Sequence, residues 1–198
     1  MYAKPFIFVL GLIESFGFSG LHIFIFTWNP TLKEVSKDFD SSYVFTILMM
    51  SLMTGGSSFS FVYSFFKQRS LSCAIVVNLL AMGGFFLIYT KSTYMMTLIG
   101  FILYEISVGL FYPSFSKIKS EYLPKDKRGT LTNIFKIPFN LIVIFLLINT
   151  NKIFTISQFN LLNLSISIIV FLMQLIFFNG AKSEEHKLEI ENEINKIK

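Results

Sequence analysis

The sequence has very few of the residues that build metal, redox and nucleophilic centres. It contains one cysteine, Cys73, and two histidines among 198 residues. A single cysteine excludes a disulfide within the chain, and a structural zinc site takes four cysteine or histidine ligands. The sequence also lacks a glycine-rich phosphate-binding loop and a paired nucleophile and base. We therefore expect no metal centre, no bound cofactor and no enzymatic activity.

Charged residues are also scarce, at 15% of the chain against about 25% in a typical soluble domain. Hydrophobic residues make up 53%, and the mean hydropathy is +0.62. The apolar residues fall in long blocks, and about 20 such residues cross a bilayer as a helix. We predict an all-α integral membrane protein that is embedded in the lipid bilayer. The net charge of +5 does not indicate nucleic-acid binding, because the basic residues lie at the ends of the apolar blocks.

Six apolar blocks predict six transmembrane helices in one membrane domain, residues 1–180. Their approximate ranges are 6–28, 43–66, 71–90, 94–115, 131–148 and 153–178. Residues 181–198 form a polar tail. Asn29-Pro30 is expected to end the first helix, because proline disfavours a helical residue before it. The loop Lys67-Gln68-Arg69 is so short that we expect the second and third helices to pack as antiparallel neighbours.

Basic residues are distributed unevenly between the two ends of the predicted helices. One end carries Lys4, Lys67, Arg69, Lys117, Lys119, Lys125, Lys127 and Arg128. The other end carries Lys33, Lys37, Lys91 and Lys152. Because short loops rich in lysine and arginine stay in the cytoplasm, both termini are predicted to be cytoplasmic. The sequence does not indicate whether the membrane is the plasma membrane or an internal one.

Three ionisable residues, Glu14, Glu105 and Lys136, lie deep inside predicted spans. A charge at the centre of a bilayer costs about 2.5–3.5 kcal/mol on insertion scales, and such residues commonly mark transport paths. From a rise of about 1.5 Å per residue, the three lie within a band roughly 8 Å tall. We expect them to share one polar site near mid-membrane. The alternative is a buried ion pair that only fixes helix packing.

Asn133 and Asn140 stand three residues before and four residues after Lys136, and therefore share its helix face. A cation between two neutral amides favours an oxyanion over a cation as the ligand. Alternatively, these amides hydrogen-bond neighbouring helices. Pro113 and Pro138 each remove a backbone hydrogen bond inside a span. We predict that they and Gly109 form kinks or gating hinges, although proline kinks can also be simply tolerated.

The segment around Glu105 and Lys136 resembles the molybdate-anion transporter family of the major facilitator superfamily. The likeness lies in Tyr104-Glu105, Val108-Gly109-Leu110, Tyr112-Pro113, Tyr122-Leu123-Pro124, Arg128, Thr130, Asn133-Ile134-Phe135, Pro138 and Asn140. These positions resemble the family's tenth helix, eleventh helix and the loop between them, in which Pro124 and Arg128 match a cytoplasmic motif. A second likeness, to the seventh helix, covers Ser15 and Phe24-Ile25-Phe26-Thr27-Trp28-Asn29-Pro30.

The resemblance implies the C-terminal six-helix half of a major facilitator fold. It further implies alternating-access transport of a small oxyanion, molybdate above all. This chain departs from the family in having Lys119 and Lys136 where the family has arginine. The family's seventh-helix glutamate falls at Phe18, and Glu14 lies one helical turn earlier.

Alternating access requires two six-helix halves that move against each other around the substrate. A second six-helix half, supplied by a homodimer or by a separate chain, is therefore expected if the protein transports. The alternatives are a partial gene product, or a half that has lost transport and acts as a membrane subunit with a structural or partner-binding role.

Overall fold

The computed structural model describes residues 4–36, 38–67, 69–90, 93–149 and 155–197. Its elements are α1 (Lys4–Val35), α2 (Ser41–Phe65), α3 (Ser70–Thr90), α4 (Tyr94–Tyr122), the short 3-10 helix η1 (Lys125–Lys127), α5 (Arg128–Asn149) and α6 (Ile156–Ile197). These described ranges contain no strand. Five helices, α1, α2, α3, α4 and α6, are long and apolar enough to cross a membrane. The protein is therefore an all-α integral membrane protein.

Some of the sequence expectations lie at positions outside the described ranges. These are the first residues of the predicted span 153–178, the basic residues Lys37, Lys91 and Lys152, and Lys198 at the end of the tail. Helix α5 covers the predicted fifth span but is not among the five helices that qualify as membrane spans in the described part of the chain.

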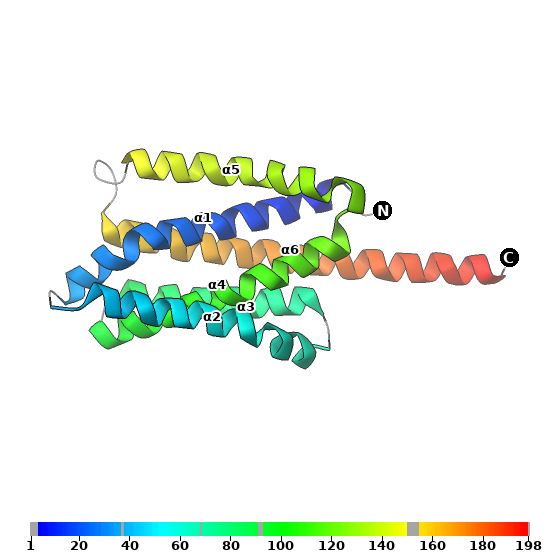
Figure 1. The fold of residues 1–198 in the computed structure, drawn as a ribbon. Coiled ribbons are helices and arrows are strands. Elements are labelled where there is room, and N and C mark those ends of the chain that lie inside the picture. The colour runs from blue at the N-terminus through cyan, green and yellow to red at the C-terminus, as the bar shows by residue number, and fades with distance from the viewer. Residues whose placement is uncertain (1–3, 37, 68, 91–92, 150–154, 198) are drawn as a thin grey trace.

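The helices pack in two groups of three, α1 with α5 and α6, and α4 with α2 and α3 (Figure 1). The groups meet mainly where α3 packs against α6, and to a smaller extent where α1 meets α4. The two groups are built alike: α1 packs on α5 and α6, just as α4 packs on α2 and α3. Both contacts between the groups join corresponding helices, α3 with α6 and α1 with α4. The two groups of three helices therefore pack in matching ways.

Glycines bring the backbones of α2 and α4 into direct contact. A Cβ atom on Gly109 would lie 2.1 Å from the carbonyl oxygen of Leu52, and one on Gly55 would lie 2.2 Å from that of Ile106. Neither position can hold a larger residue unless the helices move apart. Gly109 therefore serves a close helix crossing, the usual use of small residues in membrane bundles.

A second glycine pair holds α3 against the other side of α4. A Cβ on Gly84 would lie 2.7 Å from the carbonyl oxygen of Gly100, and one on Gly100 would lie 2.8 Å from that of Gly84. Helix α4 thus contacts both α2 and α3, which touch each other only slightly. The expectation that the second and third spans pack as neighbours was wrong, because these glycines bind each of them to α4 instead.

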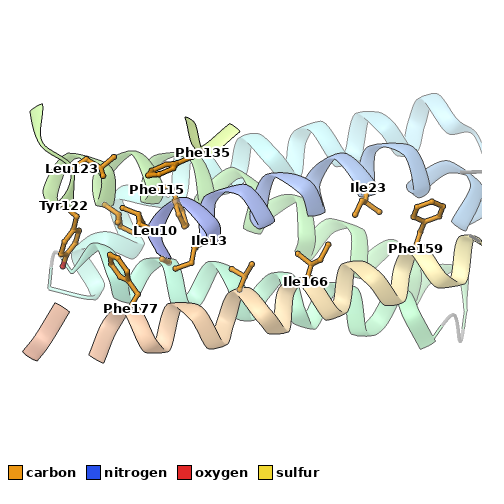
Figure 2. Packing of buried hydrophobic residues seen from close by; sticks show 13 residues of the cluster. Leu10, Ile13, Ile23, Phe115, Tyr122, Leu123, Phe135, Phe159, Ile166 and Phe177 are labelled. Atoms are coloured by element: carbon orange, nitrogen blue, oxygen red, sulfur yellow. The ribbon is translucent and has the colours of Figure 1, made fainter. Parts of the chain in front are cut away.

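Buried apolar side chains fill the seam between α1 and α6 and extend to the end of α4 and the start of α5 (Figure 2). The labelled members are Leu10, Ile13, Ile23, Phe115, Tyr122, Leu123, Phe135, Phe159, Ile166 and Phe177. On the outside of the bundle, α2 exposes Met50, Met53, Phe61 and Phe65. An apolar outer surface of this kind is what a bilayer requires.

Helix α1 continues through Pro30 to Val35, beyond the predicted end at Trp28. Thr31 and Leu32 are completely buried, and Asn160 Nδ2 on α6 donates a 3.1 Å hydrogen bond to Thr31 Oγ1. These contacts offset the backbone hydrogen bond that Pro30 removes. At the other end of the chain, α6 runs on to Ile197 and projects past the bundle, on the side where α1 begins (Figure 1).

Candidate functional site

An ion pair joins α1 to the last turn of α4. Lys119 Nζ donates a 2.5 Å charge-assisted hydrogen bond to Glu14 Oε1. The side chain of Glu14 is only 4% exposed, whereas that of Lys119 is 18% exposed. The second carboxylate oxygen, Glu14 Oε2, is buried and has no hydrogen-bond partner among the described residues. The pair therefore leaves the carboxylate half satisfied and the ammonium partly open to solvent.

Lys119 also lines an open hollow between the end of α4 and the start of α5, with a volume of about 420 Å³. We call it the α4–α5 hollow. Its lining residues are Ser116, Lys119, Ser120, Arg128, Gly129, Thr132 and Asn133. Two cations, three hydroxyls and an amide make this lining suitable for a small anion, since charge-assisted hydrogen bonds to oxyanions are the strong ones. No acidic residue belongs to the lining.

Arg128, part of the predicted loop motif, closes the end of α4. Its Nη2 donates hydrogen bonds to the carbonyl oxygens of Ser120 at 2.9 Å and Leu123 at 3.5 Å. A cation here satisfies orphan carbonyls and interacts favourably with the negative end of the helix. The buried Arg128 Nε has no hydrogen-bond partner in the described part of the chain. Pro124, the other motif residue, precedes η1 and is half-buried.

Helix α5 carries a polar stripe that begins at the hollow. Asn133, Lys136 and Asn140 are all exposed, and Asn133 also lines the hollow. The opposite face of α5 packs on α1, where the ring of Phe135 fills the space beside Gly11. Because Ser15 Oγ donates a hydrogen bond to the carbonyl of Phe135, Lys136 lies close in depth to Glu14. The polar site that Glu14 and Lys136 were expected to share remains a prediction.

Glu105 lies apart from these residues. Its side chain is 4% exposed on α4, and among the described residues no hydrogen bond or ion pair links it to Lys136. Along α4 it is about 21 Å from Lys119 by the helical rise. The structure therefore gives Glu14 a lysine partner that was not predicted, and among the described residues it shows no contact between Glu105 and Lys136, which were expected to share one polar site. The reason is that α5 packs on α1, whereas the part of α4 around Glu105 packs on α2 and α3.

The two prolines lie inside continuous helices. Pro138 deprives the carbonyl of Ile134 of its helical partner, and the neighbouring carbonyl of Phe135 receives the Ser15 hydroxyl. Pro113 likewise frees the carbonyl of Gly109, at the crossing with α2. Both prolines thus lie at helix–helix contacts, and a gating role for them and for Gly109 remains a prediction.

Sequence reasoning did not assign Lys119 to the site, because the predicted fourth span ended at Phe115. Helix α4 continues to Tyr122, so Lys119 is a helical residue that can reach back toward α1. The available signal was the absence of any helix-breaking residue between Pro113 and Pro124.

The comparisons with known proteins find similarity to proteins that are named as transporters. It is similar to the molybdate-anion transporter of Danio rerio, with 29% identity over 143 residues, covering 68% of this chain and 29% of the relative. The proteins of the same name from Takifugu rubripes and Xenopus laevis are each 27% identical over 68% of this chain. The chain thus spans less than a third of the length of the curated relatives that it matches. No family model matches it, and no solved structure matches it significantly.

Proposed function

We propose that this chain, a relative of the molybdate-anion transporters, is one half of a membrane transporter for a small oxyanion, with molybdate as the first candidate. The relatives carry that name, and the α4–α5 hollow offers Lys119 and Arg128 to an anion. The two lysines at positions 119 and 136 supply positive charge without the planar fork of arginine, so they act as point charges toward the anion.

The observation that carries the proposal is the exposed stripe Asn133, Lys136 and Asn140 on α5. A lysine and two amides on a membrane helix are costly against lipid and normally face protein or water. The stripe is continuous with the hollow through Asn133. An oxyanion entering at Lys119 and Arg128 would therefore meet Lys136 next, between the two amides.

A path along the outside of α5 needs a second wall. The proposed wall is a second six-helix half, from another copy of the chain or from a separate chain, facing α5 across the path. The matching packing of the two three-helix groups supports this, because each half of a major facilitator protein is built from two three-helix repeats of opposite orientation. In this arrangement α5 also crosses the membrane, which makes six spans. Both termini are cytoplasmic, and access alternates by rocking of the halves.

A second candidate is a membrane subunit that does not transport. It is favoured by the contacts that Glu14 and Ser15 make with neighbouring helices, since both use their polar groups in packing. In that case Lys136 would contact a partner protein and no anion would pass. A stable complex with another protein, in the absence of uptake, would support this candidate.

Uptake of labelled molybdate into liposomes that contain the purified protein tests the proposal. We expect uptake above that of empty liposomes and a loss of most of it in Lys136→Ala. Lys125→Ala is a matched control, because Lys125 is exposed on η1 and does not line the hollow. Uptake equal to that of empty liposomes would contradict transport by paired copies of this chain, and unchanged uptake in Lys136→Ala would remove Lys136 from the path.

A further inference from the structure

An interior cavity of about 50 Å³ lies between the two groups of three helices. Helices α1 and α6 line it from one group, and α3 and α4 line it from the other. The described residues of its lining include no charged side chain, which distinguishes it from the α4–α5 hollow. A single water needs about 10–15 Å³ of such space and a few polar partners. The cavity therefore has room for several water molecules.

Two buried amides lie on one face of α6 beside this cavity. Gln174 lines it and is 6% exposed, and its Oε1 has no hydrogen-bond partner among the described residues. Asn163 is completely buried, and within the same part of the chain neither its Nδ2 nor its Oδ1 has a partner. The two residues are eleven positions apart, about three helical turns, and so share a face. Buried amides normally have a protein or water partner, because leaving them unpaired is costly.

Gly20 on α1 leaves a space between Asn163 and a hydroxyl of α4. A Cβ atom on Gly20 would lie 3.6 Å from Asn163 Oδ1 and 3.8 Å from Tyr104 Oη. Gly20 and Tyr104 both line the cavity. A water molecule beside Gly20 is therefore placed to donate to the oxygen of Asn163 and to form a second hydrogen bond with Tyr104.

The same face of α6 makes direct hydrogen bonds at two other levels. Asn160 Nδ2 donates to Thr31 Oγ1 of α1 at 3.1 Å. Asn78 Nδ2 of α3 donates to the carbonyl oxygen of Ser167 at 2.9 Å. This face is thus polar along its length and bonds both groups of helices directly where a partner is within reach. The unpaired amides lie where the cavity separates them from their neighbours.

We propose that this cavity is an internal water site, in which one water bridges Asn163 and Tyr104 beside Gly20 and another pairs with Gln174 Oε1. The inference concerns the interior of the bundle and does not depend on transport of an anion. A bridging water can re-form its hydrogen bonds in several directions. The hydrated part of the seam would therefore permit small shifts of one three-helix group against the other, which direct hydrogen bonds resist.

Gly20→Ala tests the bridging water. The added Cβ lies at ordinary contact distances from its neighbours, so the helices need not move, but it takes the place of the water and leaves Asn163 unpaired. We expect the midpoint of thermal unfolding to fall by about 3 °C or more. Gly83→Ala is the matched control on α3, where an added Cβ meets nothing within 4 Å; the midpoint should stay unchanged or rise, as expected for alanine in a helix.

The background variant Asn163→Leu separates loss of the water from a steric effect. With no amide to satisfy, adding Gly20→Ala should no longer lower the midpoint. An equal fall in this background would overturn the bridge, as would a Gly20→Ala that is as stable as Gly83→Ala in the wild-type background.

A structure of the wild-type protein at a resolution that shows ordered water tests the site directly. We expect water within about 3.2 Å of Asn163 Oδ1 and of Gln174 Oε1. An empty cavity, or side chains that pair these amides with protein groups, would overturn the proposal. If the variants do not fold, this measurement alone decides it.

Discussion

Glu14 on α1 and Lys119 on α4 form an ion pair although 105 residues separate them in the sequence. The bond joins the two three-helix groups at the edge of the α4–α5 hollow. It therefore links the packing of α1 and α4 to the lining of the proposed anion site. The predictions below separate the packing contacts from the anion site.

Lys119→Met should destabilise the protein by about 3–5 kcal/mol, because it leaves the buried Glu14 carboxylate without its counter-charge. The free energy of unfolding in detergent micelles measures this. The double variant Glu14→Gln with Lys119→Met should recover much of the loss, since a neutral amide and a methionine leave no buried charge. Lys125→Met, an exposed lysine on η1, should change stability by less than about 0.5 kcal/mol. Equal stability of the single and double variants would show that the pair contributes nothing.

Gly109→Ala should loosen the crossing of α2 and α4, because the added Cβ would lie 2.1 Å from the carbonyl oxygen of Leu52. Overpacking of this kind costs roughly 1–3 kcal/mol. Gly83→Ala is the matched control on α3, where a Cβ meets nothing within 4 Å. It should be neutral or stabilising by about 0.5–1 kcal/mol, as expected for alanine in a helix. Thermal unfolding of both variants in one detergent compares them, and a Gly109→Ala as stable as Gly83→Ala would disprove the close crossing.

Ser15→Ala should weaken the attachment of α5 to α1, because it removes the hydroxyl that hydrogen-bonds the carbonyl of Phe135. A hydrogen bond of this kind contributes about 0.5–1.5 kcal/mol to stability. Hydrogen exchange of α5 amides should therefore accelerate in Ser15→Ala. Ser165→Ala, whose exposed hydroxyl bonds only to Leu161 of its own helix at 2.9 Å, should leave α5 unchanged. Equal exchange of α5 in the two variants would count against this attachment.

The class of protein could be predicted from the sequence because it depends on composition and on the length of the apolar blocks. The resemblance to molybdate-anion transporters could also be predicted, because it depends on residues such as Tyr112, Pro113 and Pro138 at fixed positions. Both were confirmed by the helices and by the relatives. The end of α1 was placed too early, because burial of Thr31 and Leu32 outweighs the effect of Pro30.

The partners of the charged residues could not be predicted, because depth along a helix does not fix the direction of a side chain. Glu105 and Lys136 lie on adjacent predicted spans, yet their helices pack on different neighbours. Glu14 contacts Lys119 because α4 continues to Tyr122, about two turns beyond its apolar block. Small residues such as Gly84 and Gly100 decide which helices meet, and their contacts appear only once the backbones are placed.

Equilibrium binding of labelled molybdate to the purified protein, compared between wild type, Lys119→Met and Lys125→Met, tests the anion site most directly. A charge-assisted hydrogen bond contributes about 1.5–3 kcal/mol, so Lys119→Met should raise the dissociation constant about tenfold or more, and Lys125→Met should leave it unchanged. Equal affinity in all three proteins, or no binding to the wild type, would contradict an oxyanion site in the α4–α5 hollow.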